Sequence, residues 1–347
     1  MNRWVVCLLL LPALVYAKCG THTTCGDCAG AKDGLFSCIW CADDNGCVSS
    51  VQTDCAKTGQ IKTTYDCPMK PPAGYEYNET LARNVAVYAT AATNGADRAG
   101  IDSCLSKISA ASTLQVTKPC DAQGDSCSGY LGYSARENLI IMAFRGSKDA
   151  DQFLDEGVDF IFNKLTTMPV IGGKVDSYFY DAFIAIYPGD FETELKRLQL
   201  LYKNAGLLVV GHSLGGSMAS IAAAYSVKKG YFTSEQVRLV TFGEPRTGDM
   251  DYAKAHDAVV KYTYRLVHQH DPVPHLPAKF LDNLFDNPFH HRYEVWYQND
   301  MNPGAAYTVC DRADDDACSN SVTNQNIQDH LHYFNHDLSN WVQTGCA

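Results

Sequence analysis

Residues 207–225 read Leu-Leu-Val-Val-Gly-His-Ser-Leu-Gly-Gly-Ser-Met-Ala-Ser-Ile-Ala-Ala-Ala-Tyr, and this stretch decides the fold. The apolar run 207–210 predicts a buried strand, and the run of small residues 218–225 predicts a helix. Between them, residues 211–215 match the pattern Gly-x-Ser-x-Gly. A strand, a tight turn and a helix form the setting in which that pattern exposes a serine hydroxyl at the edge of an α/β sheet.

The chain from residue 73 onward continues the same alternation. Apolar runs that predict strands lie at 139–144, 207–210, 237–242 and 264–267, and amphipathic stretches that predict helices lie at 80–93, 190–204 and 249–261. Strands that are apolar throughout are buried on both faces, which is typical of parallel sheets covered by helices. The sequence therefore predicts the α/β class, with a mostly parallel sheet and flanking helices.

Ser213, in the turn, is the candidate nucleophile. Gly211 and Gly215 keep the turn free of side-chain clashes, and the N-terminus of the following helix offers the backbone N–H of Leu214 to a developing oxyanion. A serine hydroxyl also needs a histidine base, and that base needs a carboxylate to hold its tautomer. In an α/β-hydrolase the carboxylate and then the histidine follow the serine along the chain.

Asp271 is the strongest carboxylate candidate, because it follows the predicted strand 264–267 in a turn that contains prolines. Residues just past a strand end lie at the active edge of an α/β sheet. Asp282 and Asp286 are alternatives in a loop. Position in the chain does not choose among five downstream histidines, which are His290, His291, His330, His332 and His336.

Histidine pairs at 290–291 and at 330 and 332 suggest a metal centre as an alternative to a site built on serine, histidine and aspartate. Two histidines at i and i+2 share a face only on a strand. No Cys, Asp or Glu pattern of zinc-ligand spacing accompanies either pair. We therefore expect the chemistry to need neither a metal nor a cofactor.

Charge and leader sequence narrow the setting in which the protein acts. The chain has 28 Lys and Arg against 39 Asp and Glu, a formal charge of −11. Binding of nucleic-acid phosphates needs a basic surface, so this charge disfavours a nucleic-acid-binding protein.

Residues 1–17 carry Arg3, an apolar run and small residues at 15 and 17, which is typical of a cleaved secretory signal peptide. No later stretch predicts a transmembrane segment. We expect a secreted, extracellular protein with an N-glycosylation site at Asn78.

The cysteine count also indicates a secreted protein. Loss of Cys7 with the signal peptide leaves 15 − 1 = 14 cysteines, an even number that suits a disulfide-bonded protein. Residues 18–68 hold eight of them among few apolar residues, so disulfides must hold that segment. Cys-x-x-Cys spacings at 25–28 and 38–41 leave zinc as an alternative, which the secretion signal disfavours. Spacing leaves the pairing of these cysteines open.

Residues 18–68 resemble the plexin–semaphorin–integrin (PSI) module through Cys25-Gly-Asp-Cys28, Cys38-Ile-Trp-Cys41 and Gly46-Cys47-Val48. The resemblance implies a spacer or an interaction platform without catalysis, whose partner stays open. Prolines at 68, 71 and 72 predict a stiff connection. The expected organisation is a signal peptide over 1–17, the module over 18–68, a linker over 69–79 and a catalytic domain over 80–347.

Five motifs in residues 80–347 resemble those of the fungal-type class 3 lipases, and they occur in the family's order. They are Phe144-Arg-Gly-Ser147, Gly211-His-Ser-Leu-Gly-Gly216, Thr241-Phe-Gly-Glu-Pro-Arg-Thr-Gly-Asp249, His270-Asp-Pro-Val-Pro-His-Leu-Pro277 and Asp329-His-Leu-His-Tyr-Phe334. The resemblance implies an α/β-hydrolase fold and a serine ester hydrolase.

The same resemblance implies roles for individual residues. Ser213 would be the nucleophile, Asp271 the orienting acid and His330 the base, because His330 stands directly before Leu-x-Tyr as the family's histidine does. Ser147 would donate a backbone N–H to the oxyanion hole beside Leu214. The family's three disulfides imply the pairs Cys104–Cys346, Cys120–Cys127 and Cys310–Cys318.

Two departures from the family bear on the substrate. Asp176 and Tyr178 stand where family members often have His and Gly, which implies a different substrate groove. Residues 148–157 match the family's mobile lid but contain four carboxylates, which oppose docking on an anionic surface.

The resulting expectation is a secreted triacylglycerol lipase that works through an acyl-enzyme, on a lipid or other ester substrate at an oil–water interface. A short-chain or aromatic esterase and a phospholipase are the alternatives among enzymes. A non-catalytic lipid-binding protein and a cell-surface adhesion protein are the alternatives from other classes.

Overall fold

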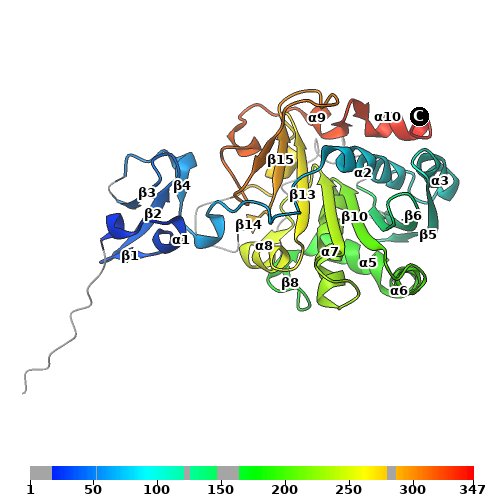
Figure 1. Ribbon diagram of the computed structural model, residues 1–347, viewed down its shortest axis with the longest axis horizontal. Coiled ribbons are helices and arrows are strands. Elements are labelled where there is room, and N and C mark those ends of the chain that lie inside the picture. Colours follow the sequence, from blue (N-terminus) through cyan, green and yellow to red (C-terminus); the bar gives the residue numbers. More distant parts are fainter. Residues whose placement is uncertain (1–17, 52, 121–125, 147–163, 280–286) are drawn as a thin grey trace, which may run out of the picture. The chain divides into compact units, whose positions relative to one another are not determined.

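The computed structural model describes residues 18–51, 53–120, 126–146, 164–279 and 287–347 (Figure 1). The chain divides into two compact units, Met1–Pro68 and Met69–Ala347. The expected signal peptide over 1–17 lies outside the described residues.

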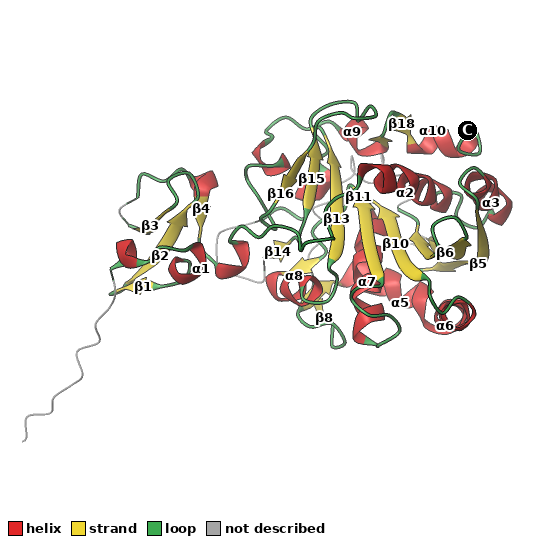
Figure 2. Ribbon diagram, viewed as in Figure 1, coloured by secondary structure: helices red, strands yellow, loops and turns green. Residues whose placement is uncertain are grey.

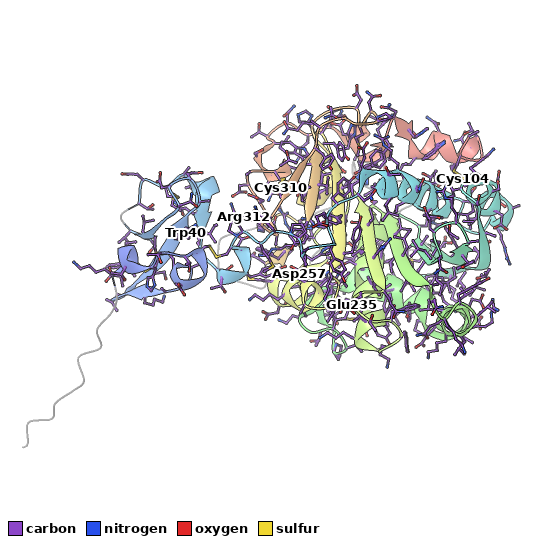
Figure 3. The ribbon with its side chains drawn as sticks, in the orientation of Figure 1. Trp40, Cys104, Glu235, Asp257, Cys310 and Arg312 are labelled. Atoms are coloured by element: carbon purple, nitrogen blue, oxygen red, sulfur yellow. A yellow bond between two sulfur atoms is a disulfide. The ribbon has the colours of Figure 1, made fainter. Side chains whose placement is uncertain are left out.

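Disulfides hold the first unit. Strand β2 (Phe36–Cys41) pairs antiparallel with β1 (Lys32–Asp33), β3 (Gly46–Ser49) and β4 (Gln60–Ile61), beside the short helix α1 (Cys25–Cys28). Its eight cysteines form the pairs Cys19–Cys38, Cys25–Cys67, Cys28–Cys47 and Cys41–Cys55. Trp40 and Ile61 pack among these sulfurs in a small core (Figure 3). The two Cys-x-x-Cys spacings therefore belong to four different disulfides and leave no thiolates for zinc.

An eight-stranded sheet forms the centre of the second unit. Its strands, in spatial order, are β16 (Thr308–Cys310), β15 (Glu294–Tyr297), β13 (Tyr262–His268), β11 (Val237–Phe242), β10 (Gly206–His212), β7 (Leu139–Phe144), β6 (Ser126–Ser134) and β5 (Ala110–Pro119). The strands from β15 to β7 run parallel, and antiparallel pairs lie at both edges. This mostly parallel sheet confirms the predicted α/β class.

Helices cover both faces of the sheet (Figure 2). One core contains residues of α2 (Glu79–Ala92), α3 (Arg98–Ser106) and α10 (Leu338–Gln343), and the other contains residues of α5 (Ser177–Ile186), α6 (Glu192–Leu201), α7 (Leu214–Lys228) and α8 (Met250–Asp257). Leu208 and Val210 of β10 face the first core, and Leu207 and Val209 face the second. Because β10 is buried on both faces, its sequence is apolar without alternation. None of the helices in the described ranges is both long and apolar enough to cross a membrane.

Smaller elements complete the second unit. A four-stranded sheet joins β8 (Leu165–Thr167), β9 (Lys174–Asp176), β12 (Gly248–Asp249) and β14 (Pro288–Phe289), and a two-stranded ribbon joins β17 (His332–Tyr333) to β18 (His336–Asp337). Helix α9 (Ile327–Leu331) precedes that ribbon and contacts β13.

Residues 69–79, which we expected to be a linker, belong to the second unit and contact its sheet. The hydroxyl of Tyr264 donates to the carbonyl oxygen of Tyr75 at 2.6 Å, and the hydroxyls of Tyr77 and Tyr297 lie 3.0 Å apart. These tyrosines fasten the segment to β13 and β15, a role that its prolines alone did not indicate.

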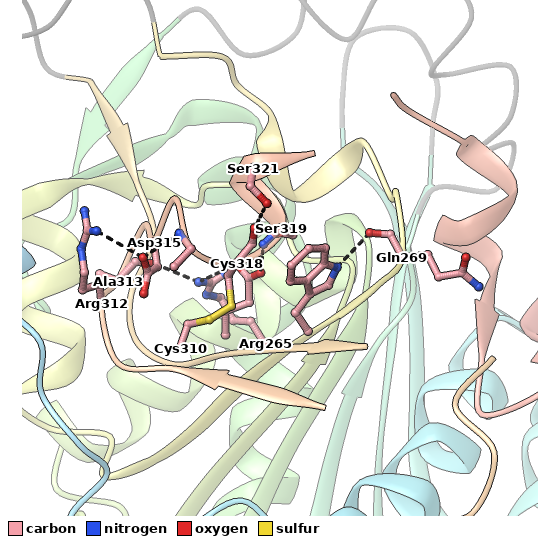
Figure 4. Close-up of a disulfide and its surroundings, with 12 residues drawn as sticks. Arg265, Gln269, Cys310, Arg312, Ala313, Asp315, Cys318, Ser319 and Ser321 are labelled. Atoms are coloured by element: carbon pink, nitrogen blue, oxygen red, sulfur yellow. Dashed lines mark hydrogen bonds and ion pairs between the residues drawn. A yellow bond between two sulfur atoms is a disulfide. The ribbon is translucent and has the colours of Figure 1, made fainter. Parts of the chain in front are cut away.

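Three disulfides join parts of the second unit, namely Cys104–Cys346, Cys120–Cys127 and Cys310–Cys318. They are the pairs that the family resemblance implied. The first links α3 to the residues after α10, and the second closes the hairpin of β5 and β6. The third lies beside Arg265, whose guanidinium donates to the carbonyl oxygen of Ala313 at 3.0 Å (Figure 4).

Candidate active site

The turn between β10 and α7 holds Ser213 in an unusual backbone conformation. Its φ is 56° and its ψ is −132°, a region that costs a residue with a side chain about 1–3 kcal/mol. The turn closes so tightly that a Cβ atom on Gly211 would collide with the carbonyl group of Gly215. The serine N–H donates to the carbonyl oxygen of Phe242 at 2.9 Å, which ties the turn to β11. The strand, turn and helix around Ser213 are those that the sequence predicted.

Asp271 follows β13 and is fully buried. Its Oδ1 accepts the N–H of Val273 at 2.9 Å, and its Oδ2 accepts the hydroxyl of Tyr333 at 3.1 Å and Nδ1–H of His330 at 2.9 Å. Burial alone would raise the pKa of this carboxyl, but the charge and hydrogen bond of His330 outweigh burial and hold the pKa below its ordinary value. The carboxylate is therefore ionised at neutral pH and fixes which nitrogen of His330 carries the proton.

His330 lies in α9 with its ring buried against Asp271. Its other ring nitrogen, Nε2, has no hydrogen-bond partner among the described residues. Of the five histidines that the sequence left open, His330 is the one whose ring contacts Asp271. His290, in contrast, bonds the carbonyl oxygen of Pro274.

The remaining candidates also have other contacts. His291 bonds Glu244, His332 bonds the carbonyl oxygen of Gln328, and His336 stacks on Trp341. Asp282 and Asp286, the alternative acids, lie outside the described residues.

His212 connects the serine turn to the histidine. Its Nε2 lies 2.7 Å from the carbonyl oxygen of His330, and the two ring centroids are 4.4 Å apart. Burial and the nearby His330 lower the pKa of His212 to about 3, so the ring stays neutral and donates its Nε2–H to that carbonyl. The residue that precedes Ser213 therefore holds the backbone of His330 in place.

The end of β7 packs against the same turn. A Cβ atom on Gly146 would lie 2.8 Å from the carbonyl oxygen of His212 and 3.2 Å from Cβ of Ser213. Leu214 is the first residue of α7, and the N–H groups in the first turn of a helix have no partner within the helix. Ser147, the other expected oxyanion donor, and the lid segment 148–157 lie outside the described residues.

A buried polar group that the sequence did not single out supports the first turn of α7. The carboxylate of Glu244 accepts hydrogen bonds from Thr241 at 2.7 Å, Thr247 at 2.8 Å and His291 at 3.1 Å. Burial raises the pKa of Glu244, but the charge and hydrogen bond of His291 hold it below the ordinary value. A Cβ atom on Gly216 would lie 3.1 Å from Cβ of Glu244. The side chain of Glu244 therefore packs closely against the first turn of α7, which follows Ser213.

Arg246 holds the loop that begins at Asp271. Its backbone N–H donates to the carbonyl oxygen of Leu276 at 2.7 Å, and its guanidinium donates to the carbonyl oxygen of Pro277 at 3.0 Å. The guanidinium also pairs with the buried carboxylate of Asp314 at 3.0 Å. Only the folded chain brings Asp314 to this position, so no spacing in the sequence could have indicated the pair.

Asp176 ends β9 and caps α5, where its carboxylate accepts the N–H of Tyr178 at 2.9 Å. Burial raises the pKa of Asp176 to about 7. The two residues at which the chain departs from the family are thus joined to each other by a helix cap.

Within the described ranges of this unit, one cluster of possible metal ligands is found. His256, Asp257 and His291 bring ligand atoms within 4.8 Å of one another. Asp257 also pairs with Arg292 at 3.4 Å, and His291 bonds Glu244. The guanidinium of Arg292 beside Asp257 opposes a cation at this cluster.

Comparison with known proteins gives the family. The profile of the class 3 lipases matches residues 141–281, and that of the plexin repeat matches residues 18–68. Lipase ZK262.3 of Caenorhabditis elegans is 31% identical over 306 residues, which cover 79% of this chain and 84% of that protein. The chain belongs to the class 3 lipase family. It is an ester hydrolase of the lipase type, with a PSI module at its N-terminal side.

Fungal relatives of this class 3 lipase extend the comparison. The lipase of Rhizomucor miehei is 30% identical over 205 residues, which cover 57% of this chain and 52% of that protein. The secreted mono- and diacylglycerol lipase 1 of Fusarium solani is 28% identical over 216 residues, 60% of each chain. The solved triacylglyceride lipase of Rhizomucor miehei has a TM-score of 0.64 at 23% identity and covers 76% of this chain and 97% of its own, so the fold is the same.

Proposed function

We propose that this class 3 lipase is a secreted hydrolase that releases fatty acids from acylglycerols, triacylglycerols among them, with Ser213, Asp271 and His330 as its catalytic triad. One observation carries the assignment. The buried pair of His330 and Asp271 leaves Nε2 of His330 without a hydrogen-bond partner in the part of the chain that the structure describes, and His212 binds that histidine to the strained turn of Ser213. The Fusarium solani relative, named as a mono- and diacylglycerol lipase, supports the substrate class.

Each residue has a defined task in this proposal. Oγ of Ser213 attacks the ester carbonyl carbon while its proton passes to Nε2 of His330. Asp271 accepts Nδ1–H of the histidine and stabilises the imidazolium that forms. The backbone N–H groups of Leu214 and Ser147 donate to the oxyanion of the tetrahedral intermediate.

The ester bond then breaks and His330 gives its proton to the leaving alcohol. The acyl group stays on Ser213 as an ester. A water molecule, deprotonated by His330, attacks this acyl-enzyme, and the fatty acid leaves with the serine restored.

Secretion is part of the proposal. All fourteen cysteines after residue 17 (15 − 1) are in disulfides, which persist only in an oxidising compartment. The secreted protein would begin at Lys18 and carry a glycan on Asn78, which is exposed at the start of α2. N-terminal sequencing and a mobility shift on deglycosylation test both points. Asn78→Asp would remove the glycan but keep a side chain that caps α2.

The test of the triad compares the parent enzyme with Ser213→Ala on p-nitrophenyl esters from C2 to C16 and on emulsified triolein. We expect hydrolysis to rise with chain length in the parent and to vanish in the variant. Ser220→Ala, a buried serine on the same helix that bonds Tyr252 at 2.8 Å, is the matched control and should retain activity.

A p-nitrophenyl alkylphosphonate should also label the parent on Ser213, as mass spectrometry of the peptides would report. Activity confined to short esters would replace the lipase by an esterase. Full activity in Ser213→Ala would refute the assignment of the nucleophile.

A further inference from the structure

The PSI module exposes large apolar side chains at one end of its small sheet. Leu35 is 94% exposed, Phe36 is 48% exposed and Val51 is 56% exposed. We call these three residues the module tip. The module has a buried core of its own around Trp40, so the exposed side chains of the tip are not an unfilled part of that core.

The strand pairing places the three residues at the same end of the sheet. Asp33 pairs with Phe36 across the hairpin of β1 and β2, so Leu35 lies in the turn itself. The pairing of β2 with β3 continues past β3, because the N–H of Ser50 donates to the carbonyl oxygen of Ser37 at 2.9 Å. Val51 follows Ser50 directly in the chain, so its backbone lies at the end of the sheet from which β2 starts with Phe36.

Disulfides make the base of the tip rigid. Cys38 in β2 and Cys47 in β3 are each joined to residues outside their hairpin, at Cys19 and Cys28. The tip is therefore a convex projection on a stiff support, and ordering it against a partner costs little conformational entropy.

The size of the tip favours a lipid over a protein as its partner. A stable protein interface buries about 800 Å² on each side and includes some twenty residues. Three side chains expose only a fraction of that area. Entry into a lipid phase has no such threshold, since each apolar side chain contributes by its own burial.

Charge indicates which lipid surface the tip fits. Residues 18–68 contain four lysines (18, 32, 57, 62) and six aspartates (27, 33, 43, 44, 54, 66), so the net charge of the module is 4 − 6 = −2. An acidic module is repelled by an anionic leaflet. An uncharged acylglycerol surface presents no such barrier.

We propose that the module tip inserts into the surface of neutral acylglycerol droplets and holds the enzyme on its substrate phase. The proposal rests on the lipase function proposed above. It gives the module a task that is separate from catalysis, since no residue of the tip belongs to the triad.

The test uses the full secreted chain in a Ser213→Ala background, so that the droplets stay intact. Flotation with triolein droplets coated with phosphatidylcholine measures partitioning. We expect Leu35→Ser/Phe36→Ser to weaken partitioning by at least about tenfold, or about 1.4 kcal/mol. The matched control is Leu200→Ser/Leu201→Ser, which removes exposed leucines (71% and 58%) of the catalytic unit and should leave partitioning unchanged.

A second measurement reports insertion directly. Tryptophan fluorescence of a Leu35→Trp variant should be quenched by brominated oil in the droplets, whereas the parent should respond little. In the catalytically competent background, Leu35→Ser/Phe36→Ser should hydrolyse p-nitrophenyl butyrate, a soluble ester, at the parent rate.

The outcomes separate the two proposals. Failure of the parent to hydrolyse p-nitrophenyl butyrate would refute the proposed function. Flotation of the Ser213→Ala protein does not depend on catalysis, so it tests the lipid proposal separately. Equal flotation of the tip variant and the control would overturn the lipid proposal. A parent protein that is dimeric in solution and becomes monomeric only in the tip variants would also overturn it, since the tip would then contact a second copy of this chain.

Discussion

Gly243 offers a sharp test of how closely the acid and base must be placed. It follows β11 directly with φ at 56°, and its N–H donates to the carbonyl oxygen of Leu266 at 3.0 Å. A Cβ atom at this position would lie 2.5 Å from Nδ1 of His330 and 2.8 Å from Oδ2 of Asp271. Ordinary contacts of this kind are no shorter than about 3.4 Å. Gly243→Ala must therefore displace the pair by about 1 Å.

The displacement sets the size of the effect. A misplacement of about 1 Å costs about a hundredfold in rate, or about 2.7 kcal/mol of barrier, and the loss falls on kcat because substrate binding is not touched. The left-handed φ adds about 1–2 kcal/mol to the cost of folding.

Gly230→Ala is the matched control, because Gly230 also has a positive φ (71°) but has nothing within 4 Å of its added Cβ. The assay is kcat and KM on p-nitrophenyl butyrate together with urea unfolding of both variants. A kcat for Gly243→Ala within threefold of that for Gly230→Ala would refute the reasoning.

Three further predictions concern the acid, a buried histidine and a disulfide. Asp271→Asn should lower kcat about 10⁴-fold, because a neutral amide does not stabilise the imidazolium and its NH2 group can donate to Nδ1 of His330, which favours the wrong tautomer. Steady-state kinetics that retain a tenth of parent activity would contradict this. Burial and the adjacent His291 lower the pKa of His256 to about 4, so the unfolded chain binds more protons at this residue below pH 6.5, and His256 alone should lower the free energy of unfolding by about 3 kcal/mol between pH 6.5 and 4. His256→Phe should make the fall over this range smaller by that amount in urea titrations, whereas parallel profiles for the two proteins would exclude the assignment. Loss of the Cys104–Cys346 bond, which spans 242 positions, should lower the free energy of unfolding by about 5 kcal/mol in the same titrations. This is about twice the effect expected for the disulfide that closes the hairpin of β5 and β6, because the longer loop loses more entropy in the unfolded chain. Equal effects would count against this chain-entropy argument.

Strands buried on both faces could be predicted from the sequence. Residues 139–144 and 237–242 were predicted within the bounds of β7 and β11, because a continuous apolar run is the direct signature of two-sided burial. β5 and β6 gave no such signal. They form an antiparallel hairpin at the sheet edge. The polar residues of β5 reflect its partial exposure, whereas β6 is mostly buried and its apolar run is interrupted by glycines and serines, at least one of which, Gly132, leaves no room for a Cβ atom against β5.

The residues of the candidate site also differ in how well local sequence signals predict them. Ser213 follows β10 directly and Asp271 lies shortly after β13, so local signals predict both at the active edge of the sheet. His330 follows no long strand and lies in the five-residue helix α9. The residues alone left five histidines open, and only the family resemblance or the folded chain selects one. Glu244 could not be assigned a role because its hydrogen-bond partner His291 is 47 positions away.

The triad also has a consequence for how the enzyme is made. Asp271 and His330 are 59 positions apart in the chain, and Ser213 precedes Asp271 by 271 − 213 = 58 positions. The three come together only when β10, β13 and α9 have all taken their places. On the proposed assignment, a nascent chain that has not yet reached residue 330 has no base and cannot cleave an ester. If the chain is secreted as proposed, an unfinished chain would therefore not hydrolyse the lipids of the membrane that it crosses.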